Sequence, residues 1–307
     1  MENLRGILFM VASMAAFAIE DAFLKAAAAD LPVGQLIFVN CAFGTVIFGA
    51  IARAQGHALF ARGAWGGMAL VRNLSEMFST LGYVTALALI PLSLAAAIIQ
   101  ASPILLTLAA ALFLGETVGW RRWAAVVVGV IGVWVILRPG AEGFDPDALW
   151  AVASVLGLTL REIATRRVAA SVGGMQLAFS ACVMLTGLGV AMMAVEGGPV
   201  MPDAGGAGLL AGVVIFGTLG YGAVIAAART GEIAVVTPFR YTRLLFALII
   251  GAAIFAERPD AATLTGAGLI IGSGLYTLAR ERKRRKLLAQ TAIPTTSPAA
   301  PVRLDNP

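Results

Sequence analysis

Long apolar segments alternate with short polar breaks along almost the whole chain. The breaks contain helix-terminating residues such as Pro32, Pro91, Pro139, Gly173 and Pro259. Most of the segments between them are about 19–25 residues long, which is enough to cross a hydrocarbon core about 30 Å thick. The pattern therefore predicts an all-α, polytopic membrane protein. Its ten transmembrane helices are expected near residues 5–25, 32–52, 65–89, 92–114, 120–138, 147–168, 173–195, 205–229, 233–256 and 261–279.

The composition favours a bilayer over water as the solvent of this chain. Of its 307 residues, 59% are hydrophobic and 13% are charged, and the mean hydropathy is +0.89. Soluble domains carry about 25% charged residues, so a surface built from this chain would be too apolar for water. The 35 glycines suit close helix packing in lipid. Arg5 and the apolar run after it resemble a signal peptide, but nine further apolar segments favour a retained first helix.

Lys and Arg residues are distributed unevenly between alternate loops. With a cytoplasmic N-terminus, the cytoplasmic segments hold 15 of them and the outer segments hold three, Lys25, Arg138 and Arg258. This bias predicts a multi-pass protein of a bacterial inner membrane with both termini in the cytoplasm. The basic run at 280–286 is typical of a topology anchor and is compatible with binding anionic lipid head groups. The segment 281–307 is expected to form a basic and then disordered cytoplasmic tail.

The two halves of the sequence match at a constant offset of 141 residues. The shift takes Ser13 to Ser154, Asp21 to Glu162, Lys25 to Arg166, Gln35 to Gln176, Cys41 to Cys182, Thr45 to Thr186 and Glu116 to Glu257. One further match, of 81–83 with 219–221, falls at 138 and implies a three-residue gap in a loop. The offset predicts two five-helix repeats, 5–138 and 147–280.

Five is an odd number of crossings, so the second repeat would enter the membrane upside down. Inverted repeats are the architecture of many secondary transporters, with the substrate site near the midplane and alternating access between the halves. The sequences Leu114-Gly115-Glu116, Ala256-Glu257-Arg258-Pro259 and Leu137-Arg138-Pro139-Gly140 stand at corresponding junctions. Together with the two-fold array, they resemble the EamA group of the drug/metabolite transporter superfamily over about residues 6–280. The resemblance implies this fold and a transport function. The group is implied to include exporters of amino acids and importers of vitamins and nucleoside-like metabolites.

Ionisable residues inside predicted membrane helices are candidates for function, because a charge in the bilayer is costly. They are Glu20, Asp21, Arg72, Glu76, Arg161, Glu162, Arg240 and Arg243. The set contains four acids and four bases, so it can pair to neutrality.

The densest polar cluster is the stretch 237–243 of the ninth predicted helix. Arg240 and Arg243 are three residues apart and share a helix face, and Tyr241 lies between them. Pro238 removes an amide donor, which favours a kink. Two interpretations stay open. These residues bind a substrate or form a gate, or the arginines pair permanently with carboxylates such as Asp21 or Glu76 and only fix the packing.

The offset of 141 points to a second half of the same site. It maps Tyr241 onto Gln100 and Arg243 onto Ser102, in the sequence Gln100-Ala101-Ser102-Pro103. Proline-interrupted polar stretches at corresponding places in the two halves are pointers to a carrier site. Gln100 and Ser102 are therefore candidate substrate contacts, with Pro103 and Pro238 as gating positions. The alternative for Gln100 is an interhelical hydrogen bond.

Four further positions carry weaker hypotheses. Arg72 and Glu76, one helical turn apart, bind substrate or neutralise each other. Tyr83 and Tyr221 stack on a flat substrate or pack as core.

Two acidic sets complete the candidates. Glu20 and Asp21 are adjacent and cannot share a face, so one of them is expected to point inward, where a carboxylate could couple transport to protons. The alternative is pairing with Lys25. Glu116 and Glu257 lie in the junction loops, where helix capping or topology is expected.

The sequence favours a secondary carrier over the other membrane functions. It has no Gly-x-x-x-x-Gly-Lys-Ser/Thr sequence to bind ATP. A membrane-embedded enzyme is a remote alternative, because neither His-Glu-x-x-His nor Gly-x-Ser-x-Gly occurs and the single His57 lies in a loop. A channel is disfavoured because channels usually form pores from symmetric oligomers. No cofactor, metal or nucleic-acid partner is expected, and a homodimer is compatible with the sequence.

The substrate is expected to be a small organic metabolite. Paired arginines suit a carboxylate or a phosphate. The stretch 17–25, with 31–35 after it, is similar to riboflavin-uptake members of the EamA group. Riboflavin is flat and aromatic, so the tyrosines and Phe239 could stack on it. Riboflavin uptake is the first hypothesis, and export of amino acids or related metabolites is the alternative.

Overall fold

A computed structural model of the chain describes residues 2–113, 119–140, 144–230 and 232–291. Within these ranges every regular element is helical, which confirms the all-α prediction. The elements are α1 Glu2–Ala27, α2 Val33–Ala54, α3 Arg62–Trp65, α4 Gly67–Leu89, α5 Leu92–Ile99, α6 Ser102–Phe113, α7 Trp120–Leu137, α8 Ala148–Thr165, α9 Gly174–Val195, α10 Ala204–Thr230, α11 Ile233–Val236, the 3-10 helix η1 Thr237–Tyr241, α12 Thr242–Ile254 and α13 Ala261–Thr291.

Eight helical segments are long and apolar enough to cross a membrane. They are Glu2–Ala27, Val33–Ala54, Leu92–Leu112, Ala148–Thr165, Gly174–Val195, Ala204–Thr230, Thr237–Ile254 and Ala261–Arg280. Trp123–Leu137 is a shorter apolar helix, and α4 has the length of a span but contains Arg72, Asn73 and Glu76. Apolar side chains such as Val46 (70% exposed) and Trp134 (64% exposed) face outward, as lipid contact requires. These features describe a multi-pass membrane protein.

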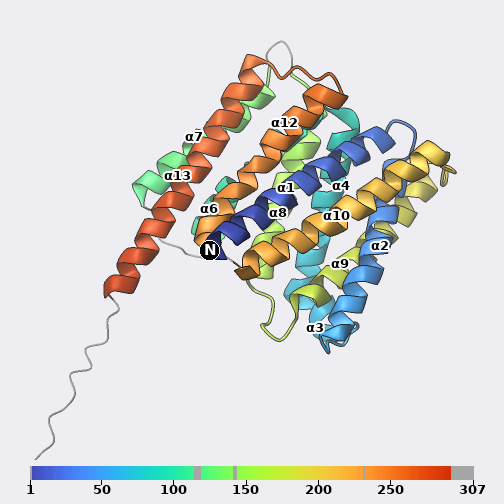
Figure 1. Cartoon of the computed structure of the whole chain (residues 1–307), viewed down its shortest axis with the longest axis horizontal. Coiled ribbons are helices and arrows are strands. Elements are labelled where there is room, and N and C mark those ends of the chain that lie inside the picture. Colours follow the sequence, from blue (N-terminus) through green and yellow to red (C-terminus); the bar gives the residue numbers. More distant parts are fainter. Residues whose placement is uncertain (1, 114–118, 141–143, 231, 292–307) are drawn as a thin grey trace, which may run out of the picture.

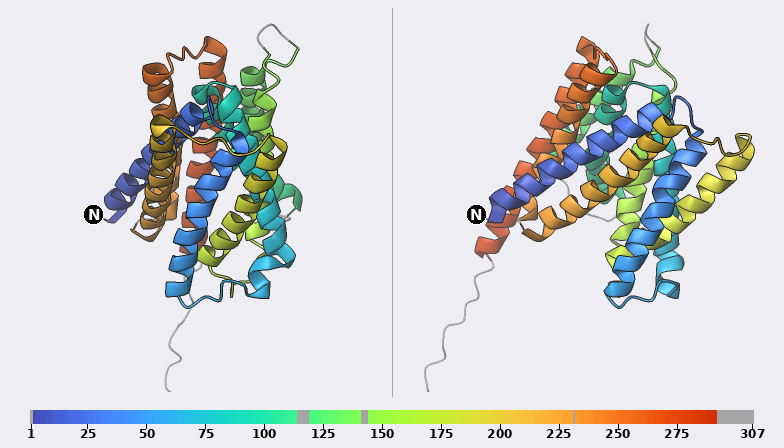
Figure 2. Two further views of the ribbon diagram at one scale, coloured as in Figure 1. Left: turned by 90° about the vertical axis from the view of Figure 1, so that its right-hand side faces the viewer. Right: turned by 45° about the vertical axis from the view of Figure 1, so that its right-hand side comes forward.

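The helices form one bundle of paired elements. Figures 1 and 2 show α7 and α13 side by side at one edge and α2 and α9 at the opposite edge. The pairs α1–α10 and α4–α8 lie between these edges and make extensive contacts. Each of these four pairs joins a helix from the first half of the chain to one from the second half.

Glycines permit the closest crossings between the halves. A Cβ added at Gly132 of α7 would lie 2.8 Å from the carbonyl oxygen of Gly266 on α13. A Cβ at Gly157 of α8 would lie 2.8 Å from the Cβ of Ser79 on α4. Only glycine lets the backbones approach this closely, and such crossings explain part of the high glycine content.

Two of the predicted helices are interrupted. The segment 92–114 divides into α5 and α6 at Gln100 and Ala101, with Pro103 in the first turn of α6. The segment 233–256 divides into α11, η1 and α12, so the α-helix is interrupted by a 3-10 helix at Pro238, the place where the kink was predicted. In both places the proline lacks the amide that would continue the α-helical hydrogen bonds.

Other boundaries also differ from the sequence prediction. The predicted helix 65–89 begins at Gly67, which has a φ of +56° and separates it from the short α3. The predicted span 261–279 agrees with the apolar part of α13, Ala261–Arg280, and the helix itself continues beyond the span to Thr291 through the basic run. The helix continues because 280–291 contains neither proline nor glycine. The rest of the predicted tail, 292–307, lies outside the described residues.

Candidate functional site

A buried ion pair joins the two halves of the bundle. Arg243, in the first turn of α12, donates from Nη2 to both carboxylate oxygens of Asp21 on α1, at 2.8 Å each. Its Nε donates to Asp21 Oδ2 at 3.1 Å. Tyr83 of α4 donates its hydroxyl to the same Oδ2 at 2.9 Å. We call Asp21, Tyr83 and Arg243 the triad.

The triad is screened from solvent on most sides. Asp21 is 1% exposed. The Arg243 guanidinium lies 5.4 Å from the ring centroids of both Phe17 and Tyr83, so aromatic faces cover it. An isolated charge buried at this depth would cost much free energy. The bidentate ion pair offsets that cost, so each charge is tolerated only while the other is present. The structure thus pairs Arg243 with Asp21, one of the two carboxylates considered from the sequence.

Lys25 is not the partner of Asp21. Its Nζ donates instead to the carbonyl oxygens of Leu87 and Ile90 at the end of α4, at 3.3 and 2.7 Å. It also lies 5.7 Å from the centroid of the Phe255 ring. Lys25 therefore fixes the ends of α1 and α4 to each other.

Glu20 also faces the protein interior, so the expectation that only one of the two adjacent acids points inward is wrong. Its Oε1 accepts a hydrogen bond from Asn40 Nδ2 of α2 at 3.1 Å, and it packs over Gly217 of α10. Neighbouring residues differ by about 100° around a helix. Because α1 is surrounded by helices on more than one side, Asp21 meets α4 and α12 while Glu20 meets α2 and α10.

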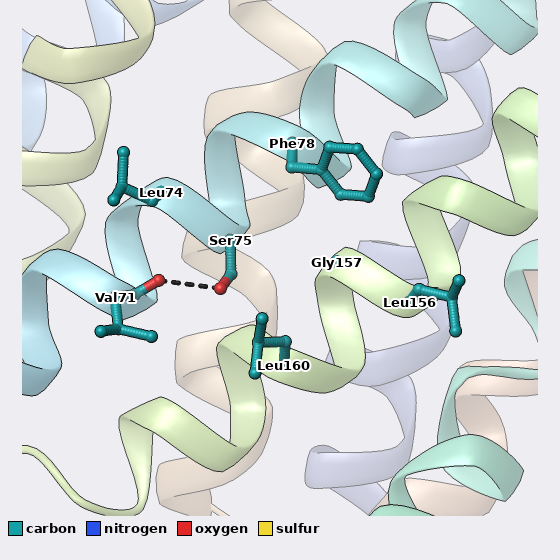
Figure 3. A pocket seen from close by; sticks show the side chains of 7 residues that line it. All are labelled: Val71, Leu74, Ser75, Phe78, Leu156, Gly157 and Leu160. Carbon is teal, nitrogen blue, oxygen red and sulfur yellow. Dashed lines mark hydrogen bonds between the residues drawn. The ribbon is translucent and has the colours of Figure 1, made fainter.

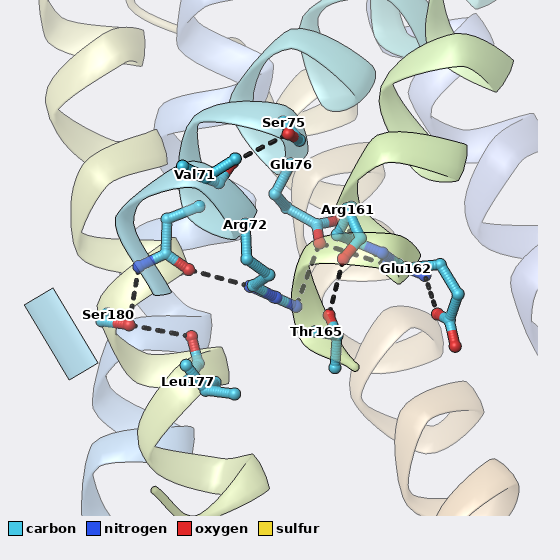
Figure 4. A network of polar contacts seen from close by, with 10 residues as sticks. Val71, Arg72, Ser75, Glu76, Arg161, Glu162, Thr165, Leu177 and Ser180 are labelled. Atoms are coloured by element: carbon cyan, nitrogen blue, oxygen red, sulfur yellow. Dashed lines mark hydrogen bonds and ion pairs between the residues drawn. The ribbon is translucent and has the colours of Figure 1, made fainter. Parts of the chain in front are cut away.

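A second charged network links α4 to α8 (Figure 4). Glu76 Oε2 lies 3.1 Å from Arg72 Nη2 and 3.1 Å from Arg161 Nη1. Arg72 also donates to Asn73 Oδ1 at 3.1 Å, and Asn73 donates to Ser180 Oγ of α9 at 2.9 Å. Arg72 and Glu76 do pair, as one interpretation of the sequence had it, but Glu76 is shared with a second arginine.

Arg161 is the residue that the sequence hypothesis missed. It was recognised as an intramembrane charge but not as a site residue, because nothing in the sequence connects position 161 with position 76. Its own neighbour Glu162 lies 3.8 Å away and is the more exposed of the two acids, at 41%. The network therefore holds two arginines and two glutamates around the contact of α4 with α8.

Arg240 lies in η1 and makes no ion pair with any of the described residues. Arg240 is an exposed residue, and its backbone oxygen accepts a hydrogen bond from Gln100 Nε2 at 3.3 Å. The two interrupted helices therefore touch at their breaks, and the interhelical bond expected for Gln100 is present. Ser102 and Pro103 begin α6 next to this contact, and Pro103 is exposed.

Two predicted site residues point elsewhere. Tyr241 is 7% exposed and packs on Gly274 of α13, where an added Cβ would overlap its hydroxyl. Its hydroxyl has no hydrogen-bond partner among the described residues. Tyr221 packs on Phe48, with ring centroids 4.6 Å apart. Neither contacts the triad, so the structure does not bring these two tyrosines together with Arg243 and Tyr83. Tyr241 lies one residue from Arg240 but on a different side of the helix.

Glutamates cap helices across the halves at the end of the bundle where α1 ends and α2 begins. Glu257 accepts hydrogen bonds from the amides of Leu92 and Ser93 at the start of α5, at 2.6 and 2.9 Å. Glu196 accepts from the amide of Gly34 at 3.0 Å, in the first turn of α2. Carboxylates at helix N-termini accept hydrogen bonds from the free amides and interact favourably with the positive end of the helix dipole. The capping role expected for Glu257 is confirmed, whereas Glu116 lies outside the described residues.

The surface hollows are mostly apolar, and neither includes the triad or the charges around Glu76. One lies between α4 and α8 and is lined by exposed side chains such as Leu74, Phe78, Leu156 and Leu160 (Figure 3). Another lies between α7 and α13, near Tyr276. Their lining suits lipid chains. Among the described residues there is also no group of three or more His, Cys, Asp or Glu side chains that could hold a metal ion.

Known proteins of similar sequence move small molecules. A riboflavin transporter of Rhizobium johnstonii is 32% identical over 71% of this chain and 72% of its own length. An S-adenosylmethionine uptake transporter of Rickettsia bellii is 26% identical over 70% and 73%. A pseudopaline exporter of Pseudomonas aeruginosa is 27% identical over 91% and 97%. The three relatives differ in what they carry, so they support transport in common and not one substrate.

The fold has a counterpart among solved structures, and a family profile covers both halves. A crystal structure that is 20% identical superposes with a TM-score of 0.59 over 92% of this chain and 98% of that one, which shows the shared fold. The profile of the EamA-like transporter family matches residues 4–138 and, a second time, 146–279. The chain is a transporter and not an enzyme, and it belongs to the EamA-like transporter family.

Proposed function

We propose that this protein is a secondary transporter of ten transmembrane helices in two inverted five-helix repeats, which moves a small organic metabolite across the bacterial inner membrane by alternating access. In this arrangement α4 and α7 join the eight apolar spans to make ten crossings, and two of those eight are the composite helices α5–α6 and α11–η1–α12. Both termini lie in the cytoplasm. This orientation rests on the excess of Lys and Arg in the loops on that side.

Pairs of contacts related by the offset of 141 support the inverted repeats. Ser13 of α1 donates to the carbonyl oxygen of Gly220 on α10 at 2.7 Å. The equivalent positions, 154 and 79, are also in contact, because Ser79 of α4 donates to the Ser154 carbonyl of α8 at 3.0 Å. A two-fold axis in the membrane plane would produce such exchanged contacts. These contacts follow the offset of 141 residues and not the offset of 138. The sequence match of 81–83 with 219–221 is therefore three residues, or about one helical turn, away from the pairing that the helix contacts show.

The same relation holds at the edge of the bundle. A Cβ at Gly132 of α7 would lie 2.9 Å from Ile270 of α13. The equivalent pair is Gly129 and Ser273, where the corresponding distance is also 2.9 Å. Two unrelated helix pairs thus obey one symmetry, which supports repeats that can exchange their conformations.

One observation carries the proposal of alternating access. The triad links α1, α4 and α12 to one another and so closes the bundle between these three helices. With the N-terminus in the cytoplasm, Asp21 lies in the outer half of α1, and the capping bonds of Glu257 and Glu196 lie on the same side. These bonds connect the two repeats on the outer side. On the inner side Arg240 remains exposed and without an ion pair among the described residues. The arrangement is that of a carrier closed to the outside, in which the triad must separate to admit substrate.

The substrate we propose is riboflavin, taken up into the cell. The 32% identity to a riboflavin transporter supports this proposal. The composition of the triad is compatible with it, because Phe17 and Tyr83 offer aromatic faces and Arg243 offers hydrogen-bond donors. A flat heteroaromatic ring with carbonyl oxygens can use both.

Growth rescue tests the proposal. The chain is expressed in a riboflavin auxotroph that lacks its own uptake system, on limiting riboflavin, beside Arg243→Ala and the control Arg53→Ala. Arg53 is exposed near the end of α2, away from the triad. The parent and Arg53→Ala are expected to restore growth at matched membrane levels, and Arg243→Ala is not. Absence of rescue by the parent would reject riboflavin, and rescue by Arg243→Ala would keep the substrate and remove Arg243 from the site.

Export of an amino acid or a related metabolite is the second candidate. It is favoured by the pseudopaline exporter, which this chain matches over 97% of the relative's length. The carboxylates of such a substrate would suit the guanidinium of Arg240, which makes no ion pair with the described residues. If the parent does not restore growth on riboflavin, comparison of metabolites released by cells with and without the protein tests this candidate.

A further inference from the structure

Glu20 is a half-buried carboxylate with no cation to neutralise it among the described residues. Its one described hydrogen bond comes from the neutral amide of Asn40, at 3.1 Å. Arg243 is the cation whose charge acts on Glu20, and its guanidinium is already engaged by both oxygens of Asp21. A carboxylate in an apolar surrounding without a counter-charge is unfavourable unless it takes up a proton or a cation.

The internal symmetry shows which counter-charge is missing. The offset of 141 relates Glu20 of α1 to Arg161 of α8, and it relates Gly217 of α10 to Glu76 of α4. In the α4–α8 pair these positions hold an ion pair, with Arg161 Nη1 at 3.1 Å from Glu76 Oε2. In the α1–α10 pair the partner position is a glycine, and an added Cβ would lie 2.7 Å from Glu20 Oε1. Glu20 therefore faces an uncharged glycine, where its equivalent Arg161 faces a charge.

From this asymmetry we infer that Glu20 is the proton-binding residue that couples transport to the proton gradient. The inference rests on the proposed transport function and adds its driving ion. A proton arriving from outside forms an O–H bond on a carboxylate oxygen of Glu20, and the bond breaks when the site opens to the cytoplasm. No electron transfer and no other reactant takes part.

The groups around Glu20 make its protonation decide the charge of the whole cluster. Asp21 is the next residue on α1, and Arg243 approaches from α12. The hydroxyl of Tyr83 approaches from α4, and Asn40 and Cys41 approach from α2. On α10 the facing residue is the uncharged Gly217. With Asp21 and Arg243 paired, a protonated Glu20 leaves the cluster neutral, and an ionised Glu20 leaves one negative charge. The transporter passes through a closed intermediate in which this cluster lies in a low-dielectric interior. A neutral cluster makes that state less costly in free energy than a charged one does.

A sodium ion fits this place less well than a proton. Metal cations of this kind need several oxygen ligands around them. Here Asn40 presents its amide nitrogen to Glu20, and the Asp21 oxygens are occupied by Arg243 and Tyr83. The same chemistry of charge neutralisation could come from either ion, so the experiment contains an arm for each.

The coupling is tested with purified protein in liposomes, with riboflavin tracer supplied in the outside medium. We compare the parent with Glu20→Gln, and with Asp30→Asn as the control, since Asp30 is exposed in the loop after α1. At zero membrane potential, one pH unit, acid outside, is expected to drive about tenfold accumulation by the parent and the control for one proton per substrate. Glu20→Gln is expected to lose this accumulation and to keep exchange of labelled for unlabelled riboflavin. Replacing K⁺ by Na⁺ outside at constant pH is expected to change nothing.

Several results would overturn the inference. Proton-driven accumulation by Glu20→Gln equal to that of the parent would do so, as would accumulation driven by Na⁺ alone. If Glu20→Gln does not fold, Glu20→Asp keeps the test, because it should retain proton-driven accumulation. If the parent exchanges no riboflavin, the proposed substrate has failed, and infrared difference spectra decide the coupling without any substrate. A protonated carboxyl C=O band that appears on acidification and is absent from Glu20→Gln or shifted in Glu20→Asp supports the inference, and no Glu20-dependent band rejects it.

Discussion

At the scale of single residues, the interior of this bundle is governed by which charges have partners. Asp21 and Arg243 satisfy each other and are tied to Tyr83. Glu76 is shared by Arg72 and Arg161. Because a buried charge is tolerated only with its partner, a substitution in one member of a pair leaves the other as the main source of instability.

The Asp21–Arg243 pair gives the first prediction. Asp21→Asn or Arg243→Gln alone should destabilise the protein by about 3–5 kcal/mol, since each leaves an uncompensated buried charge. The double variant should recover most of that loss, because two neutral amides can hydrogen-bond in the same place. The measurement is the thermal unfolding midpoint in detergent for the four proteins. Additive losses in the double variant would mean that the two side chains do not form a functional pair.

Tyr241 gives a prediction in the opposite direction. Its hydroxyl is buried without a partner among the described residues, so Tyr241→Phe should not lower the unfolding midpoint and should leave transport unchanged. Thermal unfolding and uptake assays on this variant check it. A loss of uptake at unchanged stability would restore Tyr241 to the substrate site, as the sequence had suggested.

At the scale of elements, small residues set the distance between helices. The crossing of α7 and α13 brings Gly132 and Gly266 so close that either Cβ would meet the other's carbonyl oxygen. Gly268, two residues further along α13, has open space around its missing Cβ. The same residue type on the same helix thus has two different physical roles.

This contrast predicts a matched pair of variants. Gly132→Ala should destabilise the protein by about 1–3 kcal/mol, because the backbones must move apart. Gly268→Ala should be neutral or stabilising by up to about 1 kcal/mol, because alanine favours the helix. Unfolding midpoints of both variants check this. Equal effects would show that the crossing is not tight.

The start of α13 provides a pH-dependent contact outside the membrane-spanning segments. Asp260 accepts a hydrogen bond from the Arg138 guanidinium, and its Oδ1 accepts from the Thr263 amide at 2.9 Å. The Arg138 bond, then the Thr263 amide, lower the pKa of Asp260 from 3.8 to about 2. A lowered pKa in the folded state means that the stabilisation is complete above pH 3.8 and is lost as the pH falls through about 2.

Asp260→Asn should therefore lower the unfolding midpoint slightly at pH 6 and make its decline between pH 4 and pH 2 shallower. Unfolding scans of parent and variant across this range measure the difference. Identical pH profiles would show that the contact does not contribute in solution.

At the scale of the whole molecule, the loop charges and the paired repeats make one joint prediction about orientation. Two inverted five-helix units place both termini on the same side, and the Lys and Arg excess places that side in the cytoplasm. A fluorescent protein fused after residue 291 should fluoresce, and alkaline phosphatase fused there should be inactive. The same reporters inserted after Asp145, in a predicted outer loop, should give the reverse pattern. Matching signals at the two positions would contradict the ten-helix topology.

The sequence determined the class of this protein because lipid imposes simple requirements. Segment length, hydropathy and few charges are local properties, and they predicted an all-helical membrane protein of the EamA type, as the family match bears out. Pro238 and Pro103 also act locally, so the interruptions near them were readable in advance. The number of ten transmembrane helices is a proposal, since α4 contains the charged residues Arg72 and Glu76 and is not among the eight apolar spans.

Only the tertiary structure decided which polar groups meet. Asp21 and Arg243 are 222 positions apart, and the sequence offered both Asp21 and Glu76 as partners. Arg161 looked like one more charge until packing of α8 on α4 brought it to Glu76. Tyr241 lies next to Arg240 in sequence yet turns to Gly274, because rotation about the helix separates neighbours. Hydropathy along the chain sets where the helices are, whereas the rotation and crossing of each helix set which side chains touch. That is why the sequence named most of the charged residues but could not pair them.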